Sequence, residues 1–135
     1  MKKLERVMLI DDDVNTNFYN KILLEQSNLV EDIVIFQQAM EALAYLKNDG
    51  HNVSIILLDI NMPVMNGWEF LEAYEKLDAK LKETLVVVML TSSVNKEDHE
   101  RASKINSVKR FLSKPISPED INGLVSLIEA EMVKV

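Results

Sequence analysis

Five short hydrophobic runs recur along the chain, and polar stretches of helical periodicity separate them. The runs are RVMLI (6–10), DIVIF (32–36), VSIILL (53–58), LVVVML (85–90) and VKRFL (108–112). Each has the length of a β-strand, and three are nearly continuous rather than alternating. Continuous runs are typical of parallel strands that are covered on both faces, so the pattern predicts five such strands.

The stretches between these runs repeat apolar residues with the period of a helix. Val14, Phe18 and Ile22 share one face of the first stretch, the arrangement of a helix that packs on a core. The corresponding faces of the second, third and fifth stretches are Ala39, Ala42, Leu43 and Leu46; Phe70, Leu71, Tyr74 and Leu77; and Ile121, Leu124, Val125, Ile128 and Met132. Gly50 can end the second helix, and Ser117 before Pro118 marks the start of the fifth.

The fourth stretch, NKEDHERASKIN (95–106), differs from the others because it carries little apolar surface beyond Ala102 and Ile105. This composition predicts a solvated helix that is loosely held. A weakly anchored helix beside a site is also what a conformational switch requires.

Strands and helices alternate in the order βαβαβαβαβα. This alternation predicts an α/β fold, a doubly wound parallel sheet with helices on both faces and right-handed crossovers. The length of 135 residues suits one domain, residues 1–135. Ligands of such sheets bind outside the carboxyl ends of the strands, which is where we expect a site.

Four of the five predicted strands end in polar or charged residues. These residues are Asp11, Asp12 and Asp13; Asp59; Thr91, Ser92 and Ser93; and Lys114. Carboxylates that gather at one edge resist ionising together unless a cation compensates them, and Mg²⁺ with oxygen ligands is the natural candidate. Lys114 adds a fixed positive charge and Thr91 a hydroxyl donor, which together suit a phosphoryl group on an aspartate. Asp13 can instead cap the following helix.

Composition narrows the class of protein. The chain has no cysteine, which excludes disulfides and thiolate metal sites. Its net charge of −7 argues against non-specific binding to nucleic acid or to anionic membranes. No apolar run approaches membrane-spanning length, and the N-terminus reaches three acids before a signal-peptide core could form. We therefore expect a cytoplasmic protein.

Four stretches carry a resemblance to a known family. LIDDD, LLDINMPVMNG, VMLTSS and FLSKPIS occur in the order and with nearly the spacing found in response-regulator receiver domains, and the likeness spans essentially the whole chain. The chain therefore resembles a stand-alone receiver of the chemotaxis-regulator type. The resemblance implies a flavodoxin-like sheet of five parallel strands in the order 2-1-3-4-5, with five helices.

The resemblance also implies roles for single residues. Asp59 would be the phosphoacceptor, and Thr91 and Lys114 would contact the phosphoryl group. Asp11, Asp12, Asp59 and the main-chain carbonyl of Asn61 would hold Mg²⁺. Phe111 falls on the position of the aromatic switch residue, coupled sterically to Thr91. Asn61 and Ser93 fall on the two positions that modulate the lifetime of the phosphoryl group in this family.

A receiver of this kind is a signalling module rather than an enzyme. It would take its phosphoryl group from a histidine kinase or a phosphotransfer protein and act on an output protein through the surface of the fourth helix, fifth strand and fifth helix. A relay intermediate or a phosphate sink is equally compatible with the sequence. We expect a monomer or a weak dimer.

Two other functions stay open at the level of sequence. One is a phosphohydrolase of the haloacid-dehalogenase type that uses Asp11 as its nucleophile, although Asn15 stands where that motif requires Thr or Val, and Asp59 would be unexplained. The other is a degenerate receiver that binds a partner without being phosphorylated. Which aspartate becomes phosphorylated distinguishes these functions.

Overall fold

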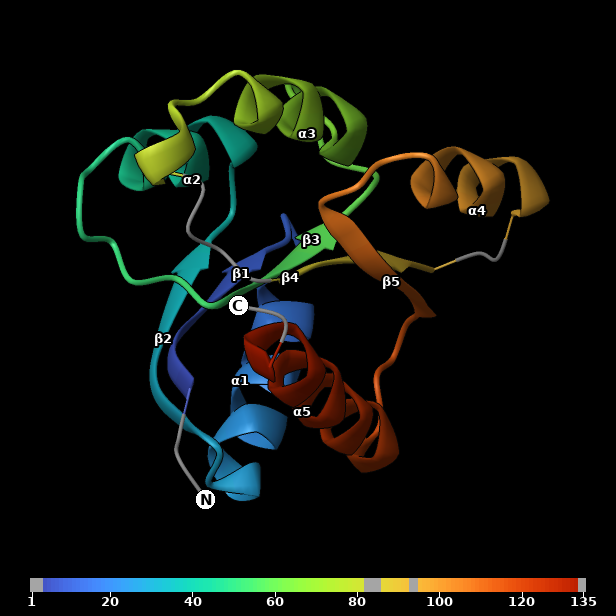
Figure 1. Cartoon of the computed structure of the whole chain (residues 1–135). Coiled ribbons are helices and arrows are strands. Elements are labelled where there is room, and N and C mark those ends of the chain that lie inside the picture. The colour runs from blue at the N-terminus through green and yellow to red at the C-terminus, as the bar shows by residue number, and fades with distance from the viewer. Residues whose placement is uncertain (1–3, 82–85, 93–94, 134–135) are drawn as a thin grey trace.

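The protein is described by a computed structural model, which covers residues 4–81, 86–92 and 95–133 (Figure 1). The strands are β1 (Leu4–Ile10), β2 (Val30–Phe36), β3 (Ile55–Asp59), β4 (Val86–Thr91) and β5 (Val108–Ser113). The α-helices are α1 (Val14–Ser27), α2 (Ala39–Leu46), α3 (Gly67–Glu75), α4 (Lys96–Ser103) and α5 (Pro118–Val133), and a 3-10 turn, Ala79–Leu81, follows α3. The predicted strands agree with these bounds to within two residues.

All strand pairs are parallel, and the sheet order is β2-β1-β3-β4-β5. The predicted fold, a doubly wound sheet in the order 2-1-3-4-5, is thereby confirmed. The register pairs Ile10 with Leu58 and Asp59 with Leu90. The carboxyl ends of the three central strands therefore lie side by side, and the polar residues that follow them meet at one edge.

The sheet is covered on both faces, which explains the continuous apolar runs. Successive residues of a strand point to opposite faces, so each central strand contributes to two cores. The core beneath α2 and α3 includes Met8, Ile10, Ile56, Leu58, Met89, Phe70 and Leu71, and the core beneath α1 and α5 includes Val7, Leu9, Ile55, Leu57, Val88, Leu24 and Leu124. Figure 1 shows α1 and α5 on one side of the sheet and α2 and α3 on the other.

Several helices begin at residues whose side chains cap the first helical turn. The Asp13 carboxylate accepts a hydrogen bond from the Asn15 amide and caps α1, as the sequence predicted. Ser117 caps α5: its hydroxyl accepts from the Asp120 amide, and the Asp120 carboxylate accepts from the Ser117 amide. Within the described residues α4 buries only Ala102, as predicted for a solvated helix.

One predicted helix face is wrong. Val14 and Phe18, expected to pack on the core, are 62% and 63% exposed. The buried residues of α1 are Asn17, Asn20, Leu23 and Leu24. The rotation of the helix is set by the Asp13 cap and by the Asn17 side chain, whose Nδ2 donates to the Asp11 carbonyl over 2.8 Å. With Asn17 held inward, Phe18 lies about 100° further round the helix axis and turns towards solvent, together with Val14 one turn before it.

The end of the second helix differs slightly from the sequence expectation. Helix α2 ends at Leu46 rather than at Gly50, which adopts a φ of 78° in the turn that follows.

No helix in the described part of the chain is both long and apolar enough to cross a lipid bilayer.

Candidate functional site

The carboxyl edge of the sheet holds a buried ion pair between a lysine and two aspartates. Lys114, just after β5, places its Nζ 2.6 Å from Asp11 Oδ2 and 2.9 Å from Asp59 Oδ1. Asp11 follows β1 and Asp59 ends β3, and only 2% and 4% of their surfaces are exposed. Three residues that are far apart in sequence are thereby brought into direct contact at the edge where their parallel strands end.

Asp59 is held rigidly by its surroundings. All five residues of β3 are buried. The next residue, Ile60, donates its amide to the Leu90 carbonyl and accepts from the Gly67 amide over 2.8 Å. Gly67 packs directly on this backbone, because a Cβ added there would lie 2.7 Å from the Asp59 carbonyl oxygen and 2.9 Å from the Ile60 Cα. The start of α3 therefore braces the phosphoacceptor candidate from behind.

Replacing Gly67 with alanine should lower the free energy of unfolding by about 1 to 3 kcal/mol, because backbone atoms at 2.7 Å must shift. The shift falls on Asp59, the predicted phosphoacceptor, so uptake of a phosphoryl group from acetyl phosphate, the reaction expected of this residue, should also slow. Urea denaturation and the rate of adduct formation check the two effects. Gly123→Ala is the matched control: a Cβ there meets nothing within 4 Å, and alanine inside α5 should stabilise by about 0.5 to 1 kcal/mol. Equal effects of the two variants would contradict the bracing role.

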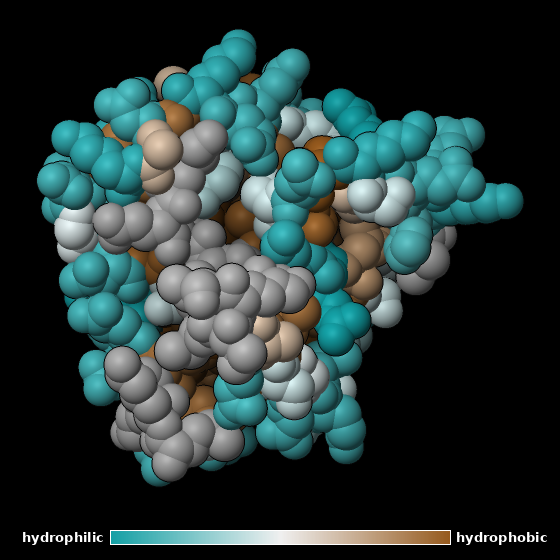
Figure 2. Space-filling model, viewed as in Figure 1, coloured by the Kyte–Doolittle hydropathy of each residue, from teal (hydrophilic) through white to brown (hydrophobic). Residues whose placement is uncertain are grey.

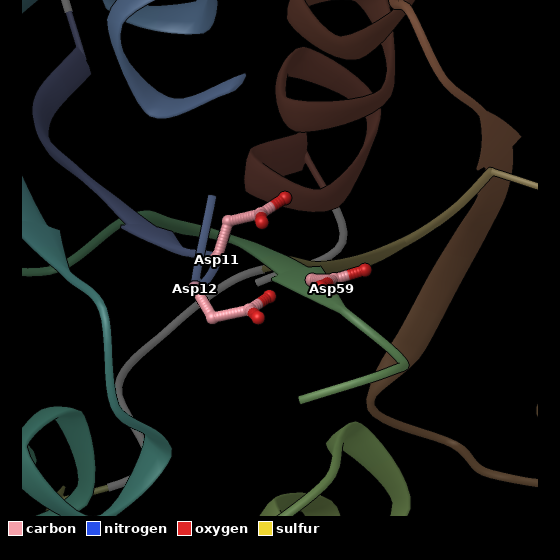
Figure 3. Close-up of side chains that lie close together, drawn as sticks. All are labelled: Asp11, Asp12 and Asp59. Carbon is pink, nitrogen blue, oxygen red and sulfur yellow. The ribbon is translucent and has the colours of Figure 1, made fainter. Parts of the chain in front are cut away.

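Three carboxylates at this edge are close enough to share a cation. Asp11, Asp12 and Asp59 each offer a ligand oxygen, and these atoms all lie within 4.8 Å of one another. Figure 3 shows Asp11 and Asp12 projecting from the end of β1 beside Asp59 at the end of β3. Asp12 is exposed, which leaves an approach for water and ligands. An all-oxygen set of this kind suits a hard divalent cation such as Mg²⁺.

The electrostatics of the site favour additional positive charge. The pKa of Asp59 is raised to about 6. Burial is the largest cause, the negative charges of Asp11 and Asp12 add to the shift, and Lys114 opposes it. The pKa of Lys114 is also raised: burial works against its charge, but the contacts with Asp11 and Asp59 outweigh burial. One lysine therefore does not compensate the carboxylates in full, and the residues fit a bound divalent cation.

A cavity of about 520 Å³ opens over these groups. Besides Asp11, Asp12, Asp59 and Lys114 it is lined by Asp13, Asn61, Ser92, Pro115 and the α1 residues Asn15, Thr16, Tyr19 and Asn20. The sequence predicted Asn61 here but not the α1 residues. Their neighbours Val14 and Phe18 suggested a different inward face for α1, so no signal in the pattern identified them.

Two supporting contacts were also absent from the sequence prediction. The Tyr19 hydroxyl donates to the Ile116 carbonyl over 3.0 Å and so ties α1 to the segment after Lys114. The Lys114 amide donates to the Thr91 carbonyl over 2.7 Å. The Lys114–Pro115 bond is cis. Both contacts fix the backbone that carries the lysine.

The predicted switch residues lie beside the site rather than in it. Thr91, at the end of β4, is 1% exposed and does not line the cavity. Phe111 on β5 is half-buried, and its ring meets the His99 ring of α4 edge-on, with centroids 5.5 Å apart. Ser93 falls outside the described residues. The aromatic ring thus connects β5 to the loosely held helix α4.

Comparisons with known proteins agree with this geometry. The sequence model of the response regulator receiver domain family matches residues 7–126 of this chain. Response regulator Rcp1 of Synechocystis is 30% identical over 92% of this chain and 86% of its own length. Hybrid signal transduction histidine kinase B of Dictyostelium discoideum is 28% identical over 97% of this chain, which spans 7% of that protein.

Solved structures give the same result. A two-component response regulator from Cytophaga hutchinsonii superposes with a TM-score of 0.89 at 30% identity, covering 96% of this chain and 99% of that one. The family-model match covers most of the chain, and the sheet order, the acidic edge and the buried lysine agree with it. The chain belongs to the response regulator receiver domain family of two-component signalling.

Proposed function

We propose that Asp59 accepts a phosphoryl group from a histidine of a kinase or of a phosphotransfer protein. The reaction would take place in the cytoplasm and would require Mg²⁺. Residues 1–135 would act together as one receiver domain. The observation that carries the proposal is the buried contact of Asp59 with Lys114 at 2.9 Å, at the end of a fully buried strand. A carboxylate held this rigidly next to a fixed cation is placed to act as a nucleophile.

The chemistry follows from the positions of these groups. An Asp59 carboxylate oxygen attacks the phosphorus atom, a P–O bond forms, and the P–N bond to the donor histidine breaks with its electron pair leaving on the imidazole. Asp59 is the ionised nucleophile above its pKa of about 6. Lys114 offsets the charge of the phosphoryl oxygens. Asp11, Asp12 and the Asn61 carbonyl would hold Mg²⁺, which when bound neutralises further phosphoryl charge.

The output of this reaction would be a change of surface rather than a released product. Helix α4 buries little, and two ring contacts link it to its neighbours: His99 meets Phe111 of β5, and the Arg101 guanidinium lies 4.4 Å from the centre of the Trp68 ring of α3. If Thr91 moves towards the phosphoryl group, Phe111 gains room to turn inward and α4 can shift. The α4–β5–α5 surface is therefore the proposed contact for an output protein.

Intact-protein mass after incubation with acetyl phosphate and Mg²⁺ tests the proposal. Wild type should gain one phosphoryl adduct that a chelator prevents, and Asp59→Asn should gain none, because it lacks the nucleophilic oxygen. An adduct that survives in Asp59→Asn and disappears in Asp11→Asn would instead favour the phosphohydrolase. Wild type without an adduct, both with acetyl phosphate and with a phosphorylated donor protein, would favour the degenerate receiver.

A further inference from the structure

The outer face of α1 and the end of β2 form an apolar surface. Val14 and Phe18 are exposed on successive turns of α1, and Ile35 of β2 is 39% exposed beside them. Together with Lys21 and Glu41 they line a hollow of about 430 Å³. We call these five residues the α1–β2 surface.

The α1–β2 surface is separate from the phosphorylation site. The site cavity is lined by Asn15, Thr16, Tyr19 and Asn20 of α1, whereas the hollow is lined by Val14, Asn17, Phe18 and Lys21. The two sets lie on different sides of the same helix. The hollow therefore requires an explanation other than phosphoryl chemistry.

Packing within the chain does not explain these exposed side chains. The inner face of α1 is already filled by its own buried residues, which include Leu23 and Leu24. Single exposed apolar residues are common on protein surfaces, but Val14, Phe18 and Ile35 are contiguous around one hollow. Among the strands of the described residues, β2 is the last at its edge of the sheet, and none of them covers this side (Figure 1). An apolar surface of this kind is typical of a contact with another protein.

The charges at the two ends of the surface indicate which protein. Helix α1 runs back along the sheet from the carboxyl edge, so Lys21 lies two turns below Val14, away from that edge. Glu41 is in the first turn of α2, which begins at the carboxyl edge after β2. The surface is therefore positive at one end and negative at the other, with the apolar residues between. Within the described residues neither Lys21 nor Glu41 forms an ion pair.

We propose that the α1–β2 surface binds a second copy of this chain around a two-fold axis. A two-fold rotation brings the same patch against itself in the opposite direction. Phe18 and Ile35 then meet their counterparts, and Lys21 of each copy faces Glu41 of the other. A surface with opposite charges at its ends is complementary to itself in this arrangement, which favours a second copy of the same surface as the partner.

Sedimentation equilibrium of the full chain tests the apolar part of the contact. Wild type should show a reversible monomer–dimer equilibrium, and Phe18→Asp should raise its dissociation constant by about tenfold or more, because a central aromatic residue is lost and a charge is introduced. Val64→Asp is the matched control. Val64 is an isolated apolar residue that is 90% exposed, and its replacement should leave the dissociation constant unchanged.

Charge exchange tests the two-fold geometry independently of Phe18. Lys21→Glu and Glu41→Lys should each weaken self-association, because like charges then face one another. An equimolar mixture of the two variants should associate about as well as wild type, since each Glu then faces a Lys in both contacts. A wild type that stays monomeric at all concentrations, an unchanged equilibrium in Phe18→Asp, or a mixture no better than either variant alone would overturn the proposal.

Discussion

Lys114→Met should lower the free energy of unfolding at pH 7.5, without Mg²⁺, by about 3 kcal/mol, and should slow phosphoryl uptake by about a hundredfold or more. The side chain of Lys114 is 16% exposed, and the carboxylates of Asp11 and Asp59 only 3% and 6%. Removing the ammonium leaves two buried negative charges facing each other. Their desolvation is no longer offset, and the phosphoryl oxygens lose their fixed cation.

Urea denaturation at several pH values checks the stability of this variant. The loss of stability should shrink as the pH falls and Asp59 takes up a proton. Mg²⁺ should restore part of it, since the cation supplies the missing positive charge. The control is Lys109→Met, which removes an exposed lysine of β5. A similar loss in both variants, or a loss that persists unchanged in acid, would contradict the role of the buried ion pair.

Asp59→Asn should make the protein more stable at pH 7.5 without Mg²⁺, by about 2 to 3 kcal/mol. The pKa of Asp59 is about 6 in the folded protein. Its ordinary value of 3.8 applies to the unfolded chain. Below the lower value both states are protonated and the variant has no advantage. Between the two values the folded state binds more protons, so wild type loses stability as the pH rises. Above about 6 this loss is complete.

Asparagine has no charge to bury, so the advantage of Asp59→Asn should grow between pH 4 and pH 6 and then level off. Lys114 keeps its contact with Asp11 in this variant and is not left unpaired. Denaturation curves of both proteins across this pH range provide the measurement, with Asp49→Asn, an exposed acid in the turn after α2, as the control. A constant difference from pH 4 to pH 8 would contradict the burial of a charged carboxylate.

Mg²⁺ should reduce this difference in stability between Asp59→Asn and wild type. A ligand that binds only the folded state stabilises it by mass action, and Asp59 is one of the three acids that would bind the ion. Wild type should therefore gain more from added Mg²⁺ than Asp59→Asn does. The buried negative charge that destabilises the site without a ligand is also what favours the binding of a cation.

The sequence by itself determined the fold and the charged centre of the site. Continuous apolar runs indicate strands that are buried on both faces, and their alternation with helices leaves few arrangements of the sheet. Asp11, Asp59 and Lys114 follow three of these runs, and a parallel sheet necessarily brings strand ends to one edge. Local sequence patterns suffice here because the carboxyl end of a strand can be recognised in the sequence, and in a parallel sheet all such ends lie at the same edge.

Only the tertiary structure decided how α1 is rotated, and with it which residues line the site and which lie outside. The pattern placed Val14 and Phe18 inward, but the hydrogen bond from Asn17 to the Asp11 carbonyl turns the helix the other way. The close packing of Gly67 on Asp59 was equally hidden. Such contacts join residues whose approach depends on the whole fold, so hydrophobic periodicity along a single helix cannot reveal them.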